Sequence, residues 1–486
     1  MTHENLAIVV LAAGQGTRMK SKLPKVLHRI GGRPLVGHVL HTAEVLGASV
    51  IEVVVRHERD RVVEAVSAHP GVAIVDQDDV PGTGRAVQAA VDALPDGFDG
   101  DVLVLSGDVP LLDADALSAL VAEHRAASAA ATVLSAELDD ATGYGRIIRG
   151  ADGTVERIVE HKDAADDELQ VREINAGVYV FRVDGLRETL PRLSADNAQG
   201  ELYVTDVVRL LREAGRTVAA SVAPDARVAL GVNDRAQLAE AARILNDRIV
   251  RRWQLEGVTI QDPATTWIDD TVTLAPDVTL LPNTHLLGAT IVAEGATIGP
   301  DTSLVDCEVG EEAVIRRADA TLAVFGARSS VGPYAYLRAG TTLGEGGKIG
   351  TFVESKNSQI GDGSKVPHLS YIGDATIGRD ANIGGGAITA NYDDVNKHRT
   401  TIDDHVHTGT HNDFVAPVRI GVGAKTGAGA VIRKDVPPGA LALSVAPQRN
   451  IAGWVEKNRA GTAAADAARQ AREQEEAAGG AQAEEG

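Results

Sequence analysis

The second half of the chain has an aliphatic residue at every sixth position over a long stretch. The unbroken series is Ile268, Leu274, Leu280, Leu286, Val292, Ile298 and Leu304, and the spacing returns in segments as far as Ile432. A six-residue period over so many turns predicts a parallel β-solenoid, with aliphatic side chains inside and small residues at tight corners. Residues 391–401 break the period, so we expect a loop extruded from a corner there.

The first half of the chain alternates short apolar runs with helical stretches. The runs cover residues 7–11, 51–55, 72–75 and 102–105, and the helical stretches cover residues 35–46, 59–68 and 85–94. Continuous apolar runs are typical of buried parallel strands, so this alternation predicts an α/β domain with a doubly wound parallel sheet. Residues 131–181 are richer in strands, and we expect them to hold the acceptor part of a binding pocket.

These patterns divide the chain into four parts. The α/β domain covers residues 1–233, a linker helix covers 234–256, and the solenoid covers 257–456. Hexapeptide repeats of this kind predict a left-handed parallel β-helix. The remaining residues, 457–486, are rich in Ala, Glu, Gln and Gly without large apolar residues, so we expect a disordered tail.

Composition narrows the choice of partners. Among 486 residues there are 47 Lys and Arg against 68 Asp and Glu, a net charge of -21, which argues against general binding of nucleic acid or of a membrane surface. Anionic small molecules remain possible ligands. A single cysteine, Cys307, excludes an internal disulfide. We find no signal peptide and no run of about 18 apolar residues, so we expect a soluble cytoplasmic protein without membrane insertion.

A glycine-containing segment, residues 11–19, directly follows the first apolar run. Its backbone N–H groups could cradle phosphates. Dinucleotide-binding and Walker loops both require glycine where Met19 stands, so neither pattern fits. Arg18 and Lys25 could neutralise charge on a leaving pyrophosphate. A plain tight turn with surface charges is the alternative interpretation.

Asp108 ends the fourth apolar run, in the sequence Ser106-Gly107-Asp108. Ligands of parallel α/β sheets bind at the carboxyl ends of the strands, and a carboxylate there suits Mg²⁺. The alternative is an aspartate that caps the following turn.

Further motifs follow in order: residues 82–84, 143–146, 160–163, 173–175 and 231–233. Together with residues 11–19, Lys25 and residues 106–108, they resemble the sugar-1-phosphate nucleotidylyltransferase family. With the β-helix, residues 6–454 resemble the bacterial bifunctional enzymes that are N-acetylglucosamine-1-phosphate uridyltransferases and glucosamine-1-phosphate N-acetyltransferases. Members of this family feed peptidoglycan and cell-wall synthesis.

The resemblance implies that the phosphate of N-acetylglucosamine-1-phosphate attacks the α-phosphorus of UTP and expels pyrophosphate. Arg18 and Lys25 would be catalytic through charge neutralisation, and Asp108 and Asn233 would hold Mg²⁺. The implied ligands of UTP and UDP-N-acetylglucosamine are Leu11, Ala12, Ala13, Gly14, Lys25, Gln77, Gly82, Thr83, Ser106, Gly107, Asp108, Gly145, Glu160, Asn175 and Asn233. Gln15 stands where the family usually has lysine, which removes one phosphate contact.

A second set of polar residues interrupts the solenoid around residues 365–371. A histidine can accept a proton near neutral pH, as an amine that attacks a thioester requires, although a lone histidine is more often structural. The resemblance implies that His368 is this base. It also implies that Arg338, Lys356, Tyr371 and Asn382 bind glucosamine-1-phosphate, and that Gly385, Asn391, Tyr392, Thr410 and Ala428 bind acetyl-CoA. Family β-helices form homotrimers.

Three positions depart from the family pattern: Gly385 replaces alanine, Thr410 replaces serine, and Val445 replaces an arginine near the CoA phosphates. Two alternatives stay open. The β-helix could be a trimerisation scaffold for a uridyltransferase only. The histidines near the interrupting loop, His398, His405, His407 and His411, could instead bind zinc, as three histidines do in hexapeptide-repeat carbonic anhydrases, although the surrounding motifs favour acetyl transfer.

Overall fold

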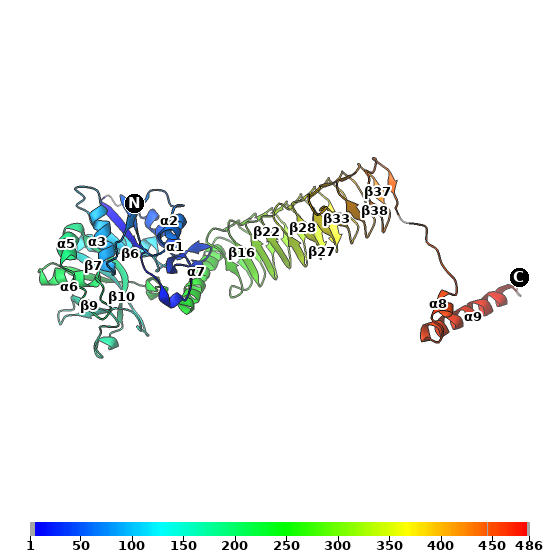
Figure 1. The fold of residues 1–486 in the computed structure, drawn as a ribbon. Coiled ribbons are helices and arrows are strands. Elements are labelled where there is room, and N and C mark those ends of the chain that lie inside the picture. Colours follow the sequence, from blue (N-terminus) through cyan, green and yellow to red (C-terminus); the bar gives the residue numbers. More distant parts are fainter. Residues whose placement is uncertain (1–4, 445, 484–486) are drawn as a thin grey trace.

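The computed structural model describes residues 5–444 and 446–483, and it contains an α/β domain, a long helix, a solenoid and a helical tail (Figure 1). The α/β domain is built on one sheet with the strand order β11-β7-β10-β6-β1-β4-β5. Its strands are β1 (Leu6–Leu11), β4 (Val50–Val55), β5 (Val72–Asp76), β6 (Asp101–Ser106), β7 (Ala131–Glu137), β10 (Glu173–Arg182) and β11 (Val218–Val222). The strands β8 (Arg146–Arg149) and β9 (Val155–Val159) extend it through β10.

Helices cover both faces of this sheet, as the prediction of a doubly wound fold requires. They are α1 (Leu35–Val45), α2 (Arg59–Val66), α3 (Thr83–Ala93), α4 (Ala114–Ala126), α5 (Val183–Thr189) and α6 (Thr205–Glu213). The strand β1 shows why: Ile8 and Val10 pack with residues of α1, α2 and α4, whereas Ala7 and Val9 pack with residues of α3, α5 and α6. A strand that is buried on both faces must be apolar throughout.

One expectation about this sheet is corrected by the structure. The sheet is not wholly parallel, because β10 runs antiparallel to both β6 and β7. The small pair β8 and β9 is also antiparallel. An apolar run fixes that a strand is buried, but it does not fix its direction.

The helix α7 (Arg235–Leu255) joins the two domains. It begins at Asp234, whose carboxylate accepts hydrogen bonds from the backbone N–H groups of Ala236 and Gln237. Such an N-cap satisfies donors that the first helical turn leaves open. Near its end, Ile249 and Trp253 pack into the first coil of the solenoid. The helix is therefore a packed joint between the domains.

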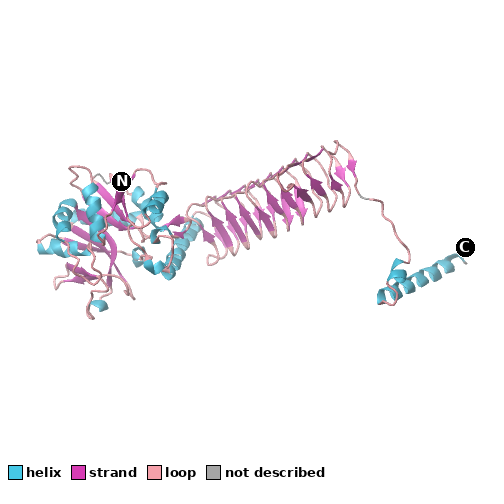
Figure 2. Cartoon of the chain, in the orientation of Figure 1, coloured by secondary structure: helices cyan, strands magenta, loops and turns pink. Residues whose placement is uncertain are grey.

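The solenoid is a left-handed β-helix of three parallel sheets (Figure 2). Sheet 1 contains β12 (Thr259–Ile260), β15 (Thr279–Leu280), β18 (Thr297–Ile298), β21 (Val314–Ile315), β24 (Ser330–Val331), β27 (Lys348–Thr351) and β30 (Lys365–His368). Sheet 2 contains β13 (Trp267–Ile268), β16 (Thr284–Leu287), β19 (Thr302–Val305), β22 (Ala318–Thr321), β25 (Ala335–Leu337), β28 (Glu354–Lys356), β31 (Tyr371–Gly373), β33 (Ile388–Ala390), β35 (Asp413–Val415) and β38 (Val431–Ile432). Sheet 3 contains β14 (Thr273–Leu274), β17 (Ile291–Val292), β20 (Glu308–Val309), β23 (Val324–Phe325), β26 (Thr342–Leu343), β29 (Gln359–Ile360), β32 (Ala375–Ile377), β34 (Thr400–Ile402) and β36 (Val418–Ile420). A last pair is β37 (Lys425–Thr426) with β39 (Leu441–Ala442).

The six-residue series fills the interior of this β-helix, and its members from Ile268 to Leu304 are at most 5 % exposed. Cys307 lies among them, fully buried. We call the turn between sheets 1 and 2 corner 1 and the turn between sheets 2 and 3 corner 2. The interrupting loop, residues 391–399, leaves from corner 2 between β33 and β34.

The tail differs from the prediction of disorder, because it contains α8 (Trp454–Asn458) and α9 (Ala463–Ala483). Alanine, glutamate, glutamine and arginine all favour helix, which explains how such a segment can be helical without a core. An ion pair between Arg472 and Glu456 ties the two helices together. Along the described parts of the chain, no helix is long and apolar enough to cross a membrane.

Candidate active sites

The first candidate site is a cavity of about 490 Å³ at the carboxyl ends of β1, β5 and β6. The predicted nucleotide ligands that line it are Leu11, Ala13, Gly14, Lys25, Gln77, Gly82, Thr83, Ser106 and Asp108. Ala12 and Gly107 support it from behind. The N–H of Ala12 donates to Val54 O at 2.9 Å, and the N–H of Gly107 donates to Leu11 O at 2.9 Å. Gln15 is also at the cavity wall.

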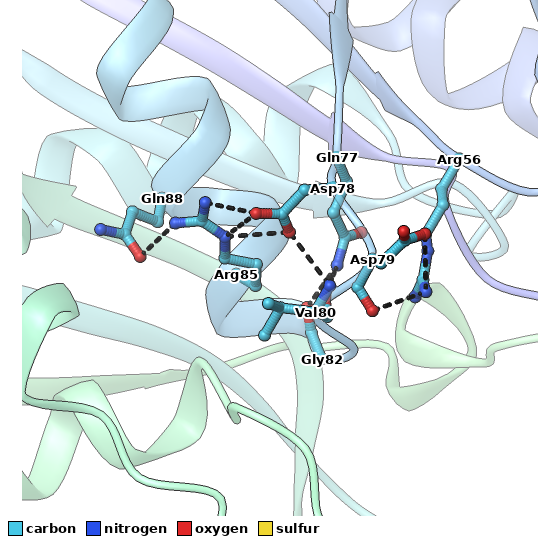
Figure 3. Close-up of polar contacts among 8 residues, drawn as sticks. All are labelled: Arg56, Gln77, Asp78, Asp79, Val80, Gly82, Arg85 and Gln88. Atoms are coloured by element: carbon cyan, nitrogen blue, oxygen red, sulfur yellow. Dashed lines mark hydrogen bonds and ion pairs between the residues drawn. The ribbon is translucent and has the colours of Figure 1, made fainter.

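A short loop between β5 and α3 forms one wall of this cavity, and Figure 3 shows its polar contacts. The amide nitrogen of Gln77 donates to the carbonyls of Val80 and Gly82, at 2.8 and 3.2 Å. Because these bonds use the amide nitrogen of Gln77, its amide oxygen is the group that remains available to a ligand. The same bonds fix the conformation of the loop.

Two arginines hold the same loop, and one of them, Arg56, also lines the cavity (Figure 3). Arg85 donates to the carboxylate of Asp78 from Nε and Nη2, the closest contact being 2.6 Å, and Arg56 donates to the backbone carbonyl of Asp79 at 2.8 Å. The Arg85 guanidinium holds the pKa of Asp78 below its ordinary value. The contacts are exposed, so each contributes little stability by itself.

A charged cluster lies at the end of β6. The Nζ atom of Lys25 forms an ion pair with Asp108 and lies 3.3 Å from Oδ1 of Asn233, to which Arg18 Nη2 donates at 2.8 Å. A carboxylate oxygen and an amide oxygen thus converge on one cation. Hard oxygen donors in this arrangement fit Mg²⁺, which takes one or two protein ligands beside phosphate oxygens and water.

A second cavity, of about 410 Å³, is lined by Arg18, Lys25, Glu160, Lys162 and Asn233 among others, and Glu160 is a predicted ligand of the acceptor sugar. Burial raises the pKa of Glu160, which the hydroxyl of Thr205 only partly offsets. Lys25 lines both cavities, so the two cavities meet at this residue. Gly145 and Asn175, both in the described part of the chain, do not line either cavity; the amide of Asn175 donates to the Tyr179 hydroxyl at 2.6 Å.

On the β-helix, four predicted residues lie along corner 1 of successive coils: His368, Gly385, Thr410 and Ala428. Backbone hydrogen bonds connect them, from Gly386 N to His368 O at 3.1 Å and from His411 N to Gly385 O at 2.8 Å. A Cβ atom at Gly385 would lie 3.4 Å from the Cβ of His368, which is ordinary contact. The departure from the family's alanine therefore leaves this corner's shape unchanged.

A group of cations lies along corner 2. Lys356 ends β28, and the neighbouring ammonium of Lys397, with a smaller effect from Arg338, holds the pKa of Lys356 below its ordinary value. Arg338 also donates to Glu354 at 3.1 Å. Like charges that crowd together on a surface favour an anionic ligand such as a phosphate, because its binding relieves their repulsion.

The two corners flank the outer face of sheet 2, where Tyr371 lies. A single chain therefore places His368 on one edge of this face and Asn391 on the other. Asn382, also predicted to bind the sugar, donates to His407 at 3.1 Å. Tyr392 is 59 % exposed at the start of the loop.

Three of the four histidines near the loop have separate side-chain partners. His398 contacts Asp393 at 2.7 Å, His407 contacts Asn382, and His405 lies 3.9 Å from Asp380. Among the residues that the structure describes, no three histidine, cysteine or acidic side chains form a group that could hold a metal ion. Val445, which replaces the family's arginine near the CoA phosphates, lies outside the described residues.

Several residues of these sites were not identified from the sequence. Lys397 stands in the loop that breaks the six-residue period, so its position in an interruption was the available signal. Arg56 and Arg85 look like surface charges in the sequence, and only the folded loop shows what they hold.

Comparisons with known proteins cover nearly the whole chain. A family model described as a MobA-like NTP transferase domain matches residues 8–256. The "Bifunctional protein GlmU" of Clavibacter sepedonicus is 62 % identical over 465 residues, which are 96 % of this chain and 94 % of that protein. Proteins of the same name from Leifsonia xyli subsp. xyli and Micrococcus luteus are 61 % and 56 % identical, each over 96 % of both chains.

Proposed function

This chain belongs to the family of the bifunctional protein GlmU, and on that premise we propose that each of its two domains carries one transfer reaction. The β-helix transfers acetyl from acetyl-CoA to glucosamine-1-phosphate. The α/β domain then transfers uridylyl from UTP to N-acetylglucosamine-1-phosphate, which yields UDP-N-acetylglucosamine and pyrophosphate. The product supplies cell-wall synthesis in the cytoplasm.

One observation carries the assignment of chemistry to the solenoid as well as to the α/β domain. A β-helix needs only small and aliphatic residues to stack its coils, yet here Arg338, Lys356 and Lys397 lie together at corner 2, and the two neighbouring carboxylates, Glu354 and Asp374, balance only part of their charge. A trimerisation scaffold alone would gain nothing from this arrangement. An anionic substrate such as glucosamine-1-phosphate explains it.

In uridylyl transfer, the protein positions two anions and neutralises charge. The loop with Gln77 and Gly82 accepts the uracil, and the backbone of residues 11–14 lies along the phosphates. Lys25 lines both cavities and Arg18 lines the second, and both cations neutralise charge on the leaving pyrophosphate. Bound between Asp108 and Asn233, Mg²⁺ would supply further neutralisation of the phosphate oxygens.

In acetyl transfer, His368 takes the proton from the attacking amine. The exposed imidazole stands at the end of β30, beside Gly385. The cations at corner 2 hold the sugar phosphate, with Tyr371 and Asn382 on the sugar. Gly385, Thr410 and Ala428 line the acetyl-CoA groove from corner 1, with Asn391 and Tyr392 supplied from corner 2.

The separation of these corners supports a homotrimer in which neighbouring subunits complete each site. Corner 1 of three successive coils, the last of them the coil of His368, exposes Tyr334, Phe352 and Leu369, at 57, 58 and 64 %. The rings of Tyr334 and Phe352 stack with centroids 5.4 Å apart. We call these three residues the apolar column. An exposed apolar row beside polar site residues is typical of a subunit interface.

The test is an assay of purified protein with glucosamine-1-phosphate, acetyl-CoA, UTP and Mg²⁺. Release of the CoA thiol and release of pyrophosphate are followed separately, and each is expected. Pyrophosphate release from N-acetylglucosamine-1-phosphate without any thiol release from glucosamine-1-phosphate would overturn the assignment to the β-helix. It would favour a scaffold role for that domain.

A further inference from the structure

Asp374 is a buried carboxylate beneath the loop that begins at Asn391. It stands at corner 2 between β31 and β32 and is 7 % exposed. Asn357, one coil earlier, and Asn391, one coil later, occupy the same corner. Three successive coils thus place an amide, a carboxylate and an amide in one column. Asp374 and Asn357 both have positive φ, at +48° and +45°, which aspartate and asparagine tolerate better than other residues with a Cβ.

The carboxylate of Asp374 is satisfied by both neighbouring amides. Asn357 Nδ2 donates to Oδ1 at 2.5 Å, and Asn391 Nδ2 donates to Oδ2 at 2.5 Å. The backbone carbonyl of Asp374 accepts from Thr400 N at 3.1 Å. One residue is therefore bonded to both ends of the loop. Within the loop, His398 N closes the turn by donating to Asn391 O at 2.8 Å.

The groups that face this carboxylate keep it ionised. Burial alone would raise the pKa of Asp374, but the two amides and the ammonium groups of Lys356 and Lys397 lower it below its ordinary value. The buried carboxylate of Asp374 can therefore hold both amides firmly. Loss of one of its acceptor oxygens would leave a buried amide N–H without a partner.

We propose that Asp374 is a positioning residue for acetyl transfer, whose carboxylate holds Asn391 and the loop from 391 to 400 in the conformation that forms the acetyl-CoA groove. This role rests on the proposed acetyl transfer by the β-helix. Asp374 contacts no reacting atom; it acts through the side chain of Asn391 and the backbone of Thr400.

The substitution Asp374→Asn keeps the shape of the side chain but replaces one acceptor oxygen with a donor, which then faces another amide donor. We expect the KM for acetyl-CoA to rise roughly tenfold or more, as for loss of a charge-assisted hydrogen bond. The substitution also removes a negative charge beside Lys356 and Lys397. The KM for glucosamine-1-phosphate should therefore stay the same or fall, whereas a general loosening of the site would raise both constants.

A second substitution provides the matched rescue. In the double variant Asp374→Asn with Asn357→Asp, the new amide again accepts from Asn391 and donates to the new carboxylate at position 357, and the net charge is restored. Asn357→Asp alone places two carboxylates against each other and should impair acetyl transfer like the first variant. Hydrogen exchange of residues 391–400 gives a readout independent of activity, and it should be faster in both single variants and slow again in the double variant.

The outcomes separate this inference from the function on which it rests. A wild-type protein that releases pyrophosphate but transfers no acetyl would overturn the proposed function. A wild-type protein that transfers acetyl, with an unchanged acetyl-CoA KM in Asp374→Asn or no recovery in the double variant, would overturn the role of Asp374. Light scattering, which shows whether each variant still forms the wild-type assembly through the β-helix, reports whether that domain is folded. Should Asp374→Asn not fold, Asn357→Asp and the double variant give the same test.

Discussion

The two candidate sites are built on loops that are held in opposite ways. The loop with Gln77 is held at the surface, by exposed contacts of Arg85 and of Arg56, which also lines the cavity. The loop that begins at Asn391 is held from beneath, by the buried carboxylate of Asp374. The residues that line the first site come together within one chain, because a doubly wound sheet brings its strand ends to one edge. The second lies on the surface of a solenoid, where the two corners of one chain lie on opposite edges of a sheet. In the proposed homotrimer, a neighbouring subunit completes this second site.

The largest expected effects come from separating the two chemistries. His368→Ala should lower acetyl transfer by roughly 10²- to 10⁴-fold, because it removes the general base, and leave uridylyl transfer intact. Asp108→Asn should do the reverse, because it removes the carboxylate beside Lys25 and the candidate Mg²⁺ ligand. Separate thiol and pyrophosphate assays measure both rates. If either variant lost both activities while still folded, the sites would not be independent.

The next effect tests whether only the second site needs a neighbour. Phe352→Glu places a charge in the apolar column and should dissociate the trimer, since burial of an unpaired charge costs several kcal/mol, about 3 to 5. Acetyl transfer should fall with the trimer, and uridylyl transfer per chain should not. Light scattering gives the assembly state. Ile291→Glu, at an exposed apolar position on sheet 3, is the matched control and should remain trimeric.

A third effect concerns a buried glutamate in the core of the α/β domain. Glu52, on β4, is 2 % exposed, and burial raises its pKa to about 7 from 4.5. As the pH rises, Glu52 loses its proton at a lower pH in the unfolded chain than in the folded chain. The free energy of unfolding is therefore highest below about pH 4.5 and falls as the pH rises to about 7. A difference of this size corresponds to about 3 kcal/mol. Glu52→Gln should abolish this fall in the free energy of unfolding, and it should not make the protein more stable at low pH.

Urea unfolding followed by loss of uridylyl transfer, at pH 4.5 and pH 8, measures this effect in the α/β domain alone. Acetyl transfer should show the same urea midpoint in wild type and variant, because Glu52 belongs to the other domain. An equal shift of both midpoints would show that the domains unfold together and would contradict the comparison.

The smallest effect tests the loop held at the surface. Asp78→Asn removes an exposed ion pair worth about 0.2 to 1 kcal/mol, so the KM for UTP should rise by up to about fivefold with kcat unchanged. Arg85→Gln should have the same effect, and the difference from wild type should shrink at high salt. A loss as large as that expected for Asp374→Asn would mean that exposed and buried supports do not differ in strength.

Sequence patterns predicted the β-helix because each coil repeats the same requirement: Leu286 and Leu304, for example, must each fill one layer of a narrow core. The apolar runs predicted the α/β sheet for a similar reason, since a strand buried on two faces can only be apolar. The direction of β10 was not predictable, because a run such as Val178 to Phe181 looks the same either way. The tail helix is not predictable from apolar patterning, because its alanine, glutamate and arginine residues favour helix without any core to bury.

The family resemblance directed attention to the site residues, but their supports depend on register. Asn357, Asp374 and Asn391 are separated by 17 positions each, which differs from the six-residue period, so their common corner becomes visible only in the folded coils. Lys397 reaches Lys356 only because an inserted loop folds back over the preceding coil. Contacts of this kind follow from three-dimensional stacking, and local sequence patterns do not encode them.

The coils between α7 and Arg338 carry none of the residues assigned to either reaction, and this makes the solenoid an adjustable spacer. Sheet 1 has six steps from β12 to β30, which at about 4.8 Å each amount to roughly 29 Å. Leu287 and Val305 occupy equivalent places in adjacent coils, so removal of residues 287–304 would join matching ends. The two reactions would move one strand spacing closer together without any change at either site. The gain or loss of one whole coil thus changes the distance between the two sites by one strand spacing and leaves the catalytic residues unchanged.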